Sequence, residues 1–103
     1  MIVINTNIPE RFFARHAGDS GIRAARAQYH AWLRIAEAAR WQTPPEIALS
    51  HPKASILKGG RVVFNIKGNS YRLVVNVDYL ASVIEIRFFG THGEYDRIEA
   101  ETI

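Results

Sequence analysis

The feature that most constrains this chain is a change in the spacing of its apolar residues near Arg61. Before that point, apolar residues recur at the three- and four-residue intervals that gather them on one face of a helix. After it, they alternate with polar residues, which is the pattern of strands with one buried face. A chain of 103 residues has room for one hydrophobic core. We therefore predict a single domain over residues 1–103, in which helices precede a sheet.

The first part of the chain is predicted to hold a short strand at Met1–Ile4 and three helices. Asn7, with Glu10 three residues later, is typical of a helix start, and this helix is expected to end at Gly18. Ser20 is the expected cap of a second, longer helix. Its predicted buried stripe consists of Ile22, Ala25, Tyr29, Trp32, Leu33 and Ala36. The run Thr43-Pro44-Pro45-Glu46 predicts a third helix that ends near Ser50.

The second part is predicted to form three antiparallel strands, at residues 61–67, 70–79 and 83–89, with a hairpin turn at Gly68-Asn69. This turn pairs Val62 with Val75, Phe64 with Leu73, and Ile66 with Tyr71 on one apolar face. Ile84, Ile86 and Phe88 are expected to join that face from the third strand. The opposite face then presents Asn65, Lys67, Arg72, Asn76, Glu85 and Arg87. The predicted fold class is α+β, with helices packed on one face of a small antiparallel sheet and an open cationic face on the other side.

The last element is a predicted short C-terminal helix that begins after Thr91. Thr91 and Glu94 fit a capping box, in which each side chain satisfies a backbone N–H of the other residue. His92, Tyr95 and Asp96 then share one face of this helix. An imidazole can donate or accept a proton near neutral pH, and arginines on the neighbouring sheet can hold a phosphate with two hydrogen bonds each. These groups meet the needs of RNA cleavage by a 2′-hydroxyl, which requires a base, an acid and cations but no metal.

Composition narrows the class of protein further. Residues 1–91 carry 12 Lys and Arg against 6 Asp and Glu, a net charge of +6, whereas residues 92–103 carry a net charge of −3. A basic body favours an anionic partner, of which nucleic acid is the commonest. The chain has no Cys and no apolar run long enough to cross a bilayer, and it begins without a secretory signal pattern. A cytoplasmic protein without membrane contact is therefore expected.

Two stretches together resemble the HigB family of toxins from bacterial type II toxin–antitoxin operons, within the RelE-like group. They are Val63–Val74, which reads VFNIKGNSYRLV, and Ile86–Asp96, which reads IRFFGTHGEYD. The resemblance extends to Trp41 with the Pro44-Pro45 turn and to Glu99–Ile103, while residues 1–40 match only in pattern. It implies a RelE-like fold and an endoribonuclease, or mRNA interferase, that cuts mRNA on the translating ribosome and so inhibits translation.

The resemblance also implies partners and site residues. The partners would be mRNA, the ribosome and a helix-turn-helix, HigA-like antitoxin, with operator DNA bound only through the antitoxin complex. The implied catalytic set is Arg72, Arg87, His92 and Tyr95, with Asn65, Lys67, Asn69 and Asp96 supporting RNA binding. No cofactor and no metal are implied. Which side chain acts as acid and which as base differs among RelE-like enzymes, so these roles do not carry over.

Simpler explanations remain open for the same residues. Asn69 is typical of a turn, Arg72 and Glu85 could form an ion pair across strands, and His92 could be an ordinary residue of a first helical turn. Two other functions are also compatible with the sequence. One is a non-catalytic RNA- or ribosome-binding module, although the cationic face lacks the aromatic residues that would stack on bases, apart from Phe89 at its end. The other is a protein-interaction domain that binds its partner by strand addition or groove packing.

Overall fold

The computed structural model describes residues 1–103 and has the predicted α+β class. Its five strands form one sheet in the order β1-β5-β4-β3-β2. The strands are β1 (Ile2–Ile4), β2 (Ser55–Ile56), β3 (Arg61–Ile66), β4 (Tyr71–Asp78) and β5 (Val83–Thr91). The helices are α1 (Asn7–Arg15), α2 (Ile22–Ala38), α3 (Pro44–Ser50) and α4 (His92–Tyr95), with a 3₁₀ turn at Lys58–Gly60. No helix is both long enough and apolar enough to cross a membrane.

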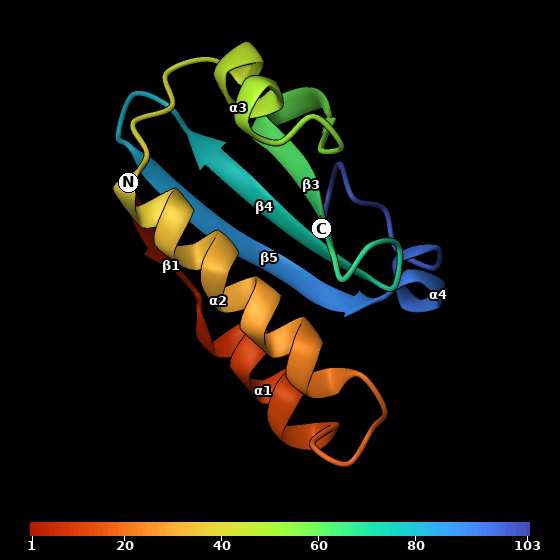
Figure 1. Ribbon diagram of the computed structural model, residues 1–103. Helices are drawn as coiled ribbons and strands as arrows, with labels where there is room; N and C mark the ends of the chain where they lie inside the picture. Colours follow the sequence, from red (N-terminus) through yellow and green to blue (C-terminus); the bar gives the residue numbers. More distant parts are fainter.

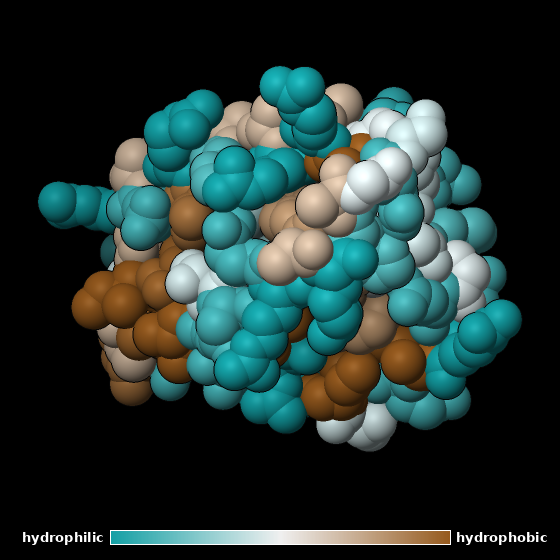
Figure 2. Space-filling model, turned by 90° about the horizontal axis from the view of Figure 1, so that it is seen from below, coloured by the Kyte–Doolittle hydropathy of each residue, from teal (hydrophilic) through white to brown (hydrophobic).

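Helices α1 and α2 lie side by side against one face of the sheet (Figure 1). The predicted stripe of α2 is buried there, except that Leu33 is only partly buried. It packs with Phe12 and Phe13 of α1 and with the apolar side chains of β3, β4 and β5 in one core. Seen from below (Figure 2), hydrophilic residues cover much of the surface, and hydrophobic residues are confined to separate patches.

The helix ends differ slightly from the prediction. The residue that caps α1 is Thr6 rather than Asn7, and α1 ends at Arg15, before Gly18. The cap of α2 is Gly21 rather than Ser20, because the chain enters this helix through a left-handed backbone with φ of 80°. Such a φ costs glycine little, whereas a serine would be strained in it.

The strand register around the predicted hairpin is confirmed. Val62 pairs with Val75, Phe64 with Leu73, and Ile66 with Tyr71, so these side chains share the core face. The turn is closed by a hydrogen bond from the Ser70 N–H to the Lys67 carbonyl, with a donor–acceptor distance of 3.1 Å. Alternation of apolar residues, combined with one turn signal, was enough to define this part of the sheet.

The prediction of a purely antiparallel sheet is wrong. Strand β1 pairs in parallel with β5, with Ile2 opposite Val83 and Ile4 opposite Glu85, so the sheet is mixed. The chain turns at Asn5, which has a φ of 65°, and passes directly into α1, so β1 cannot form a hairpin with its neighbour in sequence. Strand β2 and the 3₁₀ turn lie between the third helix and the strand that begins at Arg61, where no element was predicted.

A second correction concerns the aromatic pair at the end of β5. A register shift between Val74 and Val75 leaves Arg87 without a partner on β4, as in a β-bulge. The extra residue reverses the alternation, so that Phe89 pairs with Leu73 and is buried in the core. Phe88 instead pairs with Val74, outside the core, so the prediction that Phe88 joins the apolar face is wrong.

We call the sheet face opposite α1 and α2 the second face. Its residues on β3, β4 and β5 are Arg61, Val63, Asn65, Arg72, Val74, Asn76, Glu85, Arg87, Phe88 and Gly90, and the bulge places the predicted residue Arg87 there beside Phe88. Val63 and Val74 are buried there, and the main-chain oxygen of Ile103 reaches Arg61 on this face. The second face is therefore polar at both ends but partly covered, and the expectation of a fully open face is corrected.

Candidate nucleic-acid interface

Helix α4 is fixed to the end of the sheet by the predicted capping box. The Thr91 N–H donates to Glu94 Oε1 at 2.8 Å, and the Glu94 N–H donates to Thr91 Oγ1 at 3.1 Å. In addition, the His92 N–H donates to the Ser70 carbonyl at 3.0 Å, which ties the helix to the start of β4. The side chains of α4 are thus held beside the β3–β4 hairpin.

Arg72 is placed by the hairpin turn and by α4 together. Its Nη1 donates to the carbonyl oxygen of Asn69 at 3.2 Å, and its Nη2 donates to the Asn69 side-chain oxygen. Its guanidinium carbon lies 5.7 Å from the centre of the Tyr95 ring, within the range of a cation–π contact. Arg72 makes no ion pair with Glu85, so the alternative of a cross-strand salt bridge does not apply; Arg87 pairs with Glu85 instead.

His92 and Asp96 form a second polar pair on α4. His92 Nε2 lies 3.7 Å from Asp96 Oδ2, and the two side chains are 48% and 59% exposed. The imidazole is therefore accessible to a ligand and keeps a carboxylate next to one of its ring nitrogens. The structure brings five predicted residues together at this corner: Asn69, Arg72, His92, Tyr95 and Asp96.

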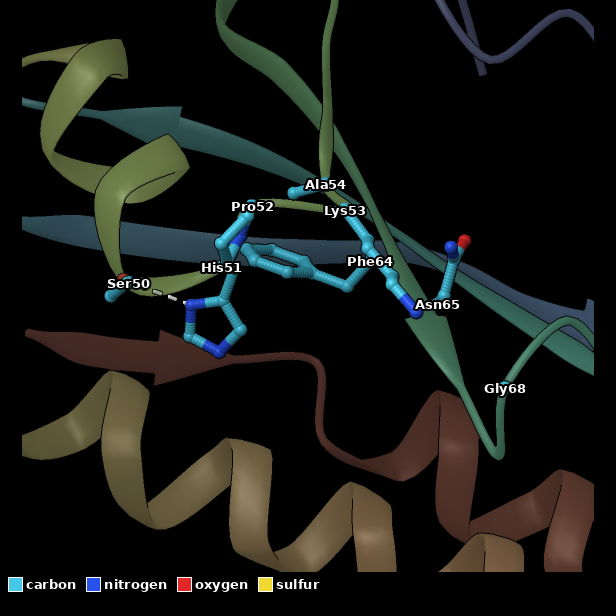
Figure 3. A pocket seen from close by; sticks show the side chains of 8 residues that line it. All are labelled: Ser50, His51, Pro52, Lys53, Ala54, Phe64, Asn65 and Gly68. Carbon is cyan, nitrogen blue, oxygen red and sulfur yellow. Dashed lines mark hydrogen bonds between the residues drawn. The ribbon is translucent and has the colours of Figure 1, made fainter.

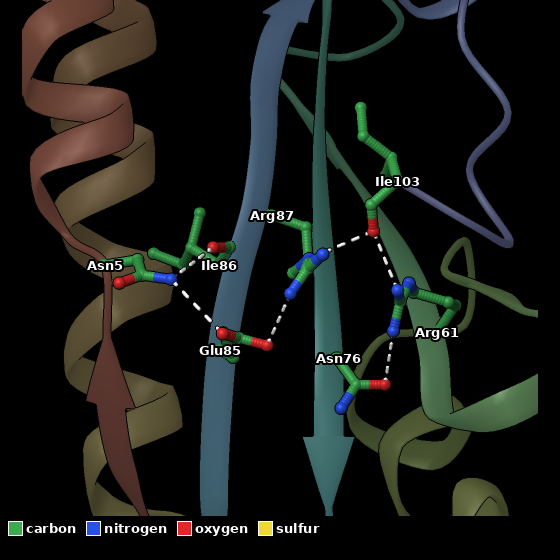
Figure 4. Close-up of polar contacts among 7 residues, drawn as sticks. All are labelled: Asn5, Arg61, Asn76, Glu85, Ile86, Arg87 and Ile103. Atoms are coloured by element: carbon green, nitrogen blue, oxygen red, sulfur yellow. Dashed lines mark hydrogen bonds and ion pairs between the residues drawn. The ribbon is translucent and has the colours of Figure 1, made fainter.

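Arg87 lies farther from this cluster. Its Nη1 donates to Glu85 Oε1 at 2.9 Å and its Nε donates to the main-chain oxygen of Ile103 at 3.0 Å (Figure 4). The guanidinium is thus occupied by these two oxygens. The structure does not join Arg87 to Arg72 in a single contact.

The two remaining predicted residues differ in their placement. Asn65 pairs with Arg72 across the strands, so its exposed side chain lies on the second face as predicted. Lys67 has a φ of 54° and belongs to the turn, and its N–H donates to Gln28 Oε1 at 2.6 Å. A Cβ atom at Gly21 would lie 2.8 Å from Lys67 Nζ, so the lysine side chain lies against the start of α2. The prediction that Lys67 lies on the cationic face is therefore wrong.

Phe88 and Gly90 are parts of the site that the sequence analysis missed. A Cβ atom at Gly90 would lie 2.6 Å from Phe88 Cζ and 3.0 Å from Glu94 Oε1, so the Phe88 ring crosses the glycine beside the capping box. An aromatic side chain is thus present on the second face. Two adjacent phenylalanines in a strand cannot both face the core, and this was the available signal.

A cavity of about 420 Å³ opens between the α3–β2 connection and the edge of β3 (Figure 3). It is lined by Ser50, His51, Pro52, Lys53, Ala54, Phe64, Asn65 and Gly68. Burial lowers the pKa of His51, whose Nδ1 lies 2.9 Å from Ser50 Oγ. No group of three His, Asp or Glu side chains is placed to hold a metal ion.

A comparison with known families gives the family of this chain. Residues 25–98 match the model of the HigB toxin family, described as the RelE-like toxic component of a toxin–antitoxin system. The match covers most of the chain and includes the whole cluster around Arg72. The chain belongs to the HigB toxin family, and its partner in such a system is an antitoxin. No curated protein matches the chain.

Proposed function

We propose that this protein is an mRNA interferase, an endoribonuclease that cleaves mRNA by attack of a 2′-hydroxyl on the adjacent phosphorus. The observation that carries the proposal is the placement of Arg72 over the Tyr95 ring, anchored by Asn69, on the same corner as the His92–Asp96 pair. A guanidinium and an imidazole at one edge of a basic sheet are two of the groups that phosphodiester cleavage requires, a cation for the phosphate and a group that transfers a proton.

The chemistry assigned to each group follows from its surroundings. Arg72 would bind the scissile phosphate and stabilise the charge that develops on its oxygens, because a guanidinium offers two parallel donors. His92 would transfer a proton to or from the sugar oxygens, with Asp96 orienting the ring. Tyr95 would position Arg72 and could stack on a base. Arg87 would supply a further cation for the RNA backbone.

The proposed setting is the translating ribosome, where cleavage of mRNA would inhibit translation. The proposed antitoxin is a helix-turn-helix, HigA-like protein, and operator DNA would be bound only through the complex of the two. These assignments rest on membership of the HigB toxin family.

The test uses purified protein, ribosomes and mRNA in the presence of a chelator. We expect fragments with 2′,3′-cyclic or 3′-phosphate ends. His92→Gln should lower the cleavage rate by roughly 100-fold or more, as for loss of a general acid or base. Arg72→Lys keeps the charge but removes the paired donors, and should lower the rate by about 100-fold.

His16→Gln is the matched control, because His16 also lies beside an exposed carboxylate, that of Asp19 at 2.7 Å, but follows α1 on the helix-covered face of the sheet (Figure 1). It should cleave like the wild type. Intact mRNA after incubation with the wild type, or a His92→Gln variant with full activity, would reject the proposal.

One observation favours a second candidate, a module that binds RNA without cutting it. Phe88 and Tyr95 supply aromatic rings near Arg72, whereas the only aromatic residue predicted at this face was Phe89, which is buried in the core. RNA with 2′-O-methyl groups cannot react by 2′-hydroxyl attack but can still be bound. Binding of methylated RNA together with intact unmodified RNA would support this candidate over the first.

A further inference from the structure

The C-terminal segment Glu99–Ile103 returns to the second face and ends between two arginines. The main-chain oxygen of Ile103 accepts a hydrogen bond from Arg61 Nη2 at 2.7 Å and another from Arg87 Nε at 3.0 Å (Figure 4). Arg61 comes from β3 and Arg87 from β5, so the two guanidinium groups converge on this oxygen across the intervening strand β4. The segment lies outside the residues that match the family, which end at residue 98.

The Arg61 side chain has unused capacity to bind an anion. Its Nη1 donates to Asn76 Oδ1 at 2.6 Å, but its Nε is buried without any hydrogen-bond partner. No acidic side chain forms an ion pair with it, whereas Arg87 has Glu85. A partly buried guanidinium with one N–H group left without an acceptor is costly, because that group gives up water without gaining a hydrogen bond. A phosphate oxygen placed where the Ile103 oxygen now lies would accept from both arginines.

The position between Arg61 and Arg87 also fits the path of an RNA strand that is bound at Arg72. Asn76, which pairs with Arg61, is four residues from Arg72 along β4, or about 13 Å at the usual rise of a strand. Both arginines lie on the second face, and Arg87 lies between them along the sheet. A strand bound at Arg72 could therefore reach Arg61 and Arg87 with a neighbouring phosphate. Glu99 and Glu101 are exposed on the segment that covers this place, and their charge opposes a phosphate.

We propose that Arg61 and Arg87 form a second phosphate-binding position for RNA, and that the C-terminal segment fills this position in the free protein. RNA and the segment then compete for the same two guanidinium groups. This inference rests on the proposed function in that it names RNA as the ligand, and it adds Arg61 to the interface and a self-blocking role for the last five residues.

The experiment measures binding of a fluorescent single-stranded RNA with 2′-O-methyl groups, so that cleavage plays no part. A chain that stops at Ile98 should bind this RNA about tenfold more tightly than the full chain, because two charge-assisted hydrogen bonds become available to phosphate. Arg61→Ala should weaken binding about tenfold in the shortened chain but much less in the full chain, where the position is already filled. In the shortened chain, Arg61→Ala should also reduce the salt dependence by about one phosphate contact.

Two controls separate the effect of the segment filling the Arg61–Arg87 position from the effect of its negative charges. The Glu99→Gln, Glu101→Gln double variant removes the same two negative charges but keeps the segment, and should give only part of the gain. Lys58→Ala removes an exposed cation near Arg61 in sequence and should weaken binding equally in both chain lengths. If the shortened chain does not fold, deletion of Ile103 alone removes the accepting oxygen and should tighten binding in the same direction.

Equal binding by the full and shortened chains would overturn the inference, as would a gain that the double glutamine variant reproduces completely. The proposed function is judged separately by cleavage of unmodified mRNA. Tighter binding on shortening, without any cleavage, would support the inference and reject the nuclease. Cleavage of unmodified mRNA together with unchanged binding on shortening would support the nuclease and reject the inference.

Discussion

The backbone conformation and the close packing at residue 60 favour glycine over any other residue. The φ of Gly60 is 83°, and a Cβ atom there would lie 2.9 Å from the carbonyl oxygen of Val77 on β4. Gly60→Ala should therefore lower the free energy of unfolding by about 2 kcal/mol, because the alanine meets both an unfavourable φ and a fixed backbone atom. Urea unfolding measures this change. Gly18→Ala is the matched control, since Gly18 has open space around it and no positive φ, and it should change stability by less than about 0.5 kcal/mol. Equal effects of the two changes would contradict the argument.

At the same scale, the candidate site shows which side chains could be placed from the sequence. Arg72 was placed correctly because strand alternation and a confirmed register fix the face of every residue between two turns. His92 and Asp96 were placed together because their spacing on a helix does not depend on the rest of the fold. Lys67 was misplaced because it lies in the turn, where a positive φ sends the side chain away from the alternation of the strand.

Among the elements, β5 offers the sharpest test of the register. Phe89 is 5% exposed and contacts the rings of Phe12, Phe13 and Tyr71, whereas Phe88 lies outside the core. Phe89→Ala should cost about 3–5 kcal/mol of stability, as for other buried aromatic side chains. Phe88→Ala should cost much less and should act chiefly on RNA binding. Urea unfolding of both variants measures the two losses of stability. A larger loss of stability for Phe88→Ala than for Phe89→Ala would mean that the strand has no bulge at Arg87.

The elements also differ in how far they could be predicted. The helices, the β3–β4 hairpin and the capping box of α4 follow from local patterns, and each was found within a few residues. The parallel pairing of β1 with β5 joins residues at opposite ends of the chain, and no local signal records it. The bulge at Arg87 is a single inserted residue that leaves the alternating pattern of the sequence without a visible break, so only the three-dimensional structure reveals it.

For the whole molecule, the lowered pKa of His51 leads us to predict how the free energy of unfolding depends on pH. Burial lowers its pKa from 6.5, so the folded chain favours the neutral imidazole, which packs against Trp41 and Phe64. The unfolded chain therefore binds more protons as the pH falls, and the stability contributed by the neutral ring is present above pH 6.5 and lost below it. Urea unfolding between about pH 7.5 and pH 5.5 should show a decrease that is smaller in His51→Gln. An equally steep decrease in that variant would show that another group is responsible.

The pairing of Ile2 with Val83 has a consequence for how the protein is made. A ribosome synthesises β1 well before its neighbour β5, because α1, α2, α3 and the other strands lie between them in the chain. The helices can begin to form early, but the sheet cannot close its edge until the last strand has left the ribosome. A nascent chain that stalls before β5 also lacks Arg87 and the whole of α4. An unfinished copy of this protein therefore lacks the imidazole, the phenol and one of the arginines on which the proposed cleavage depends.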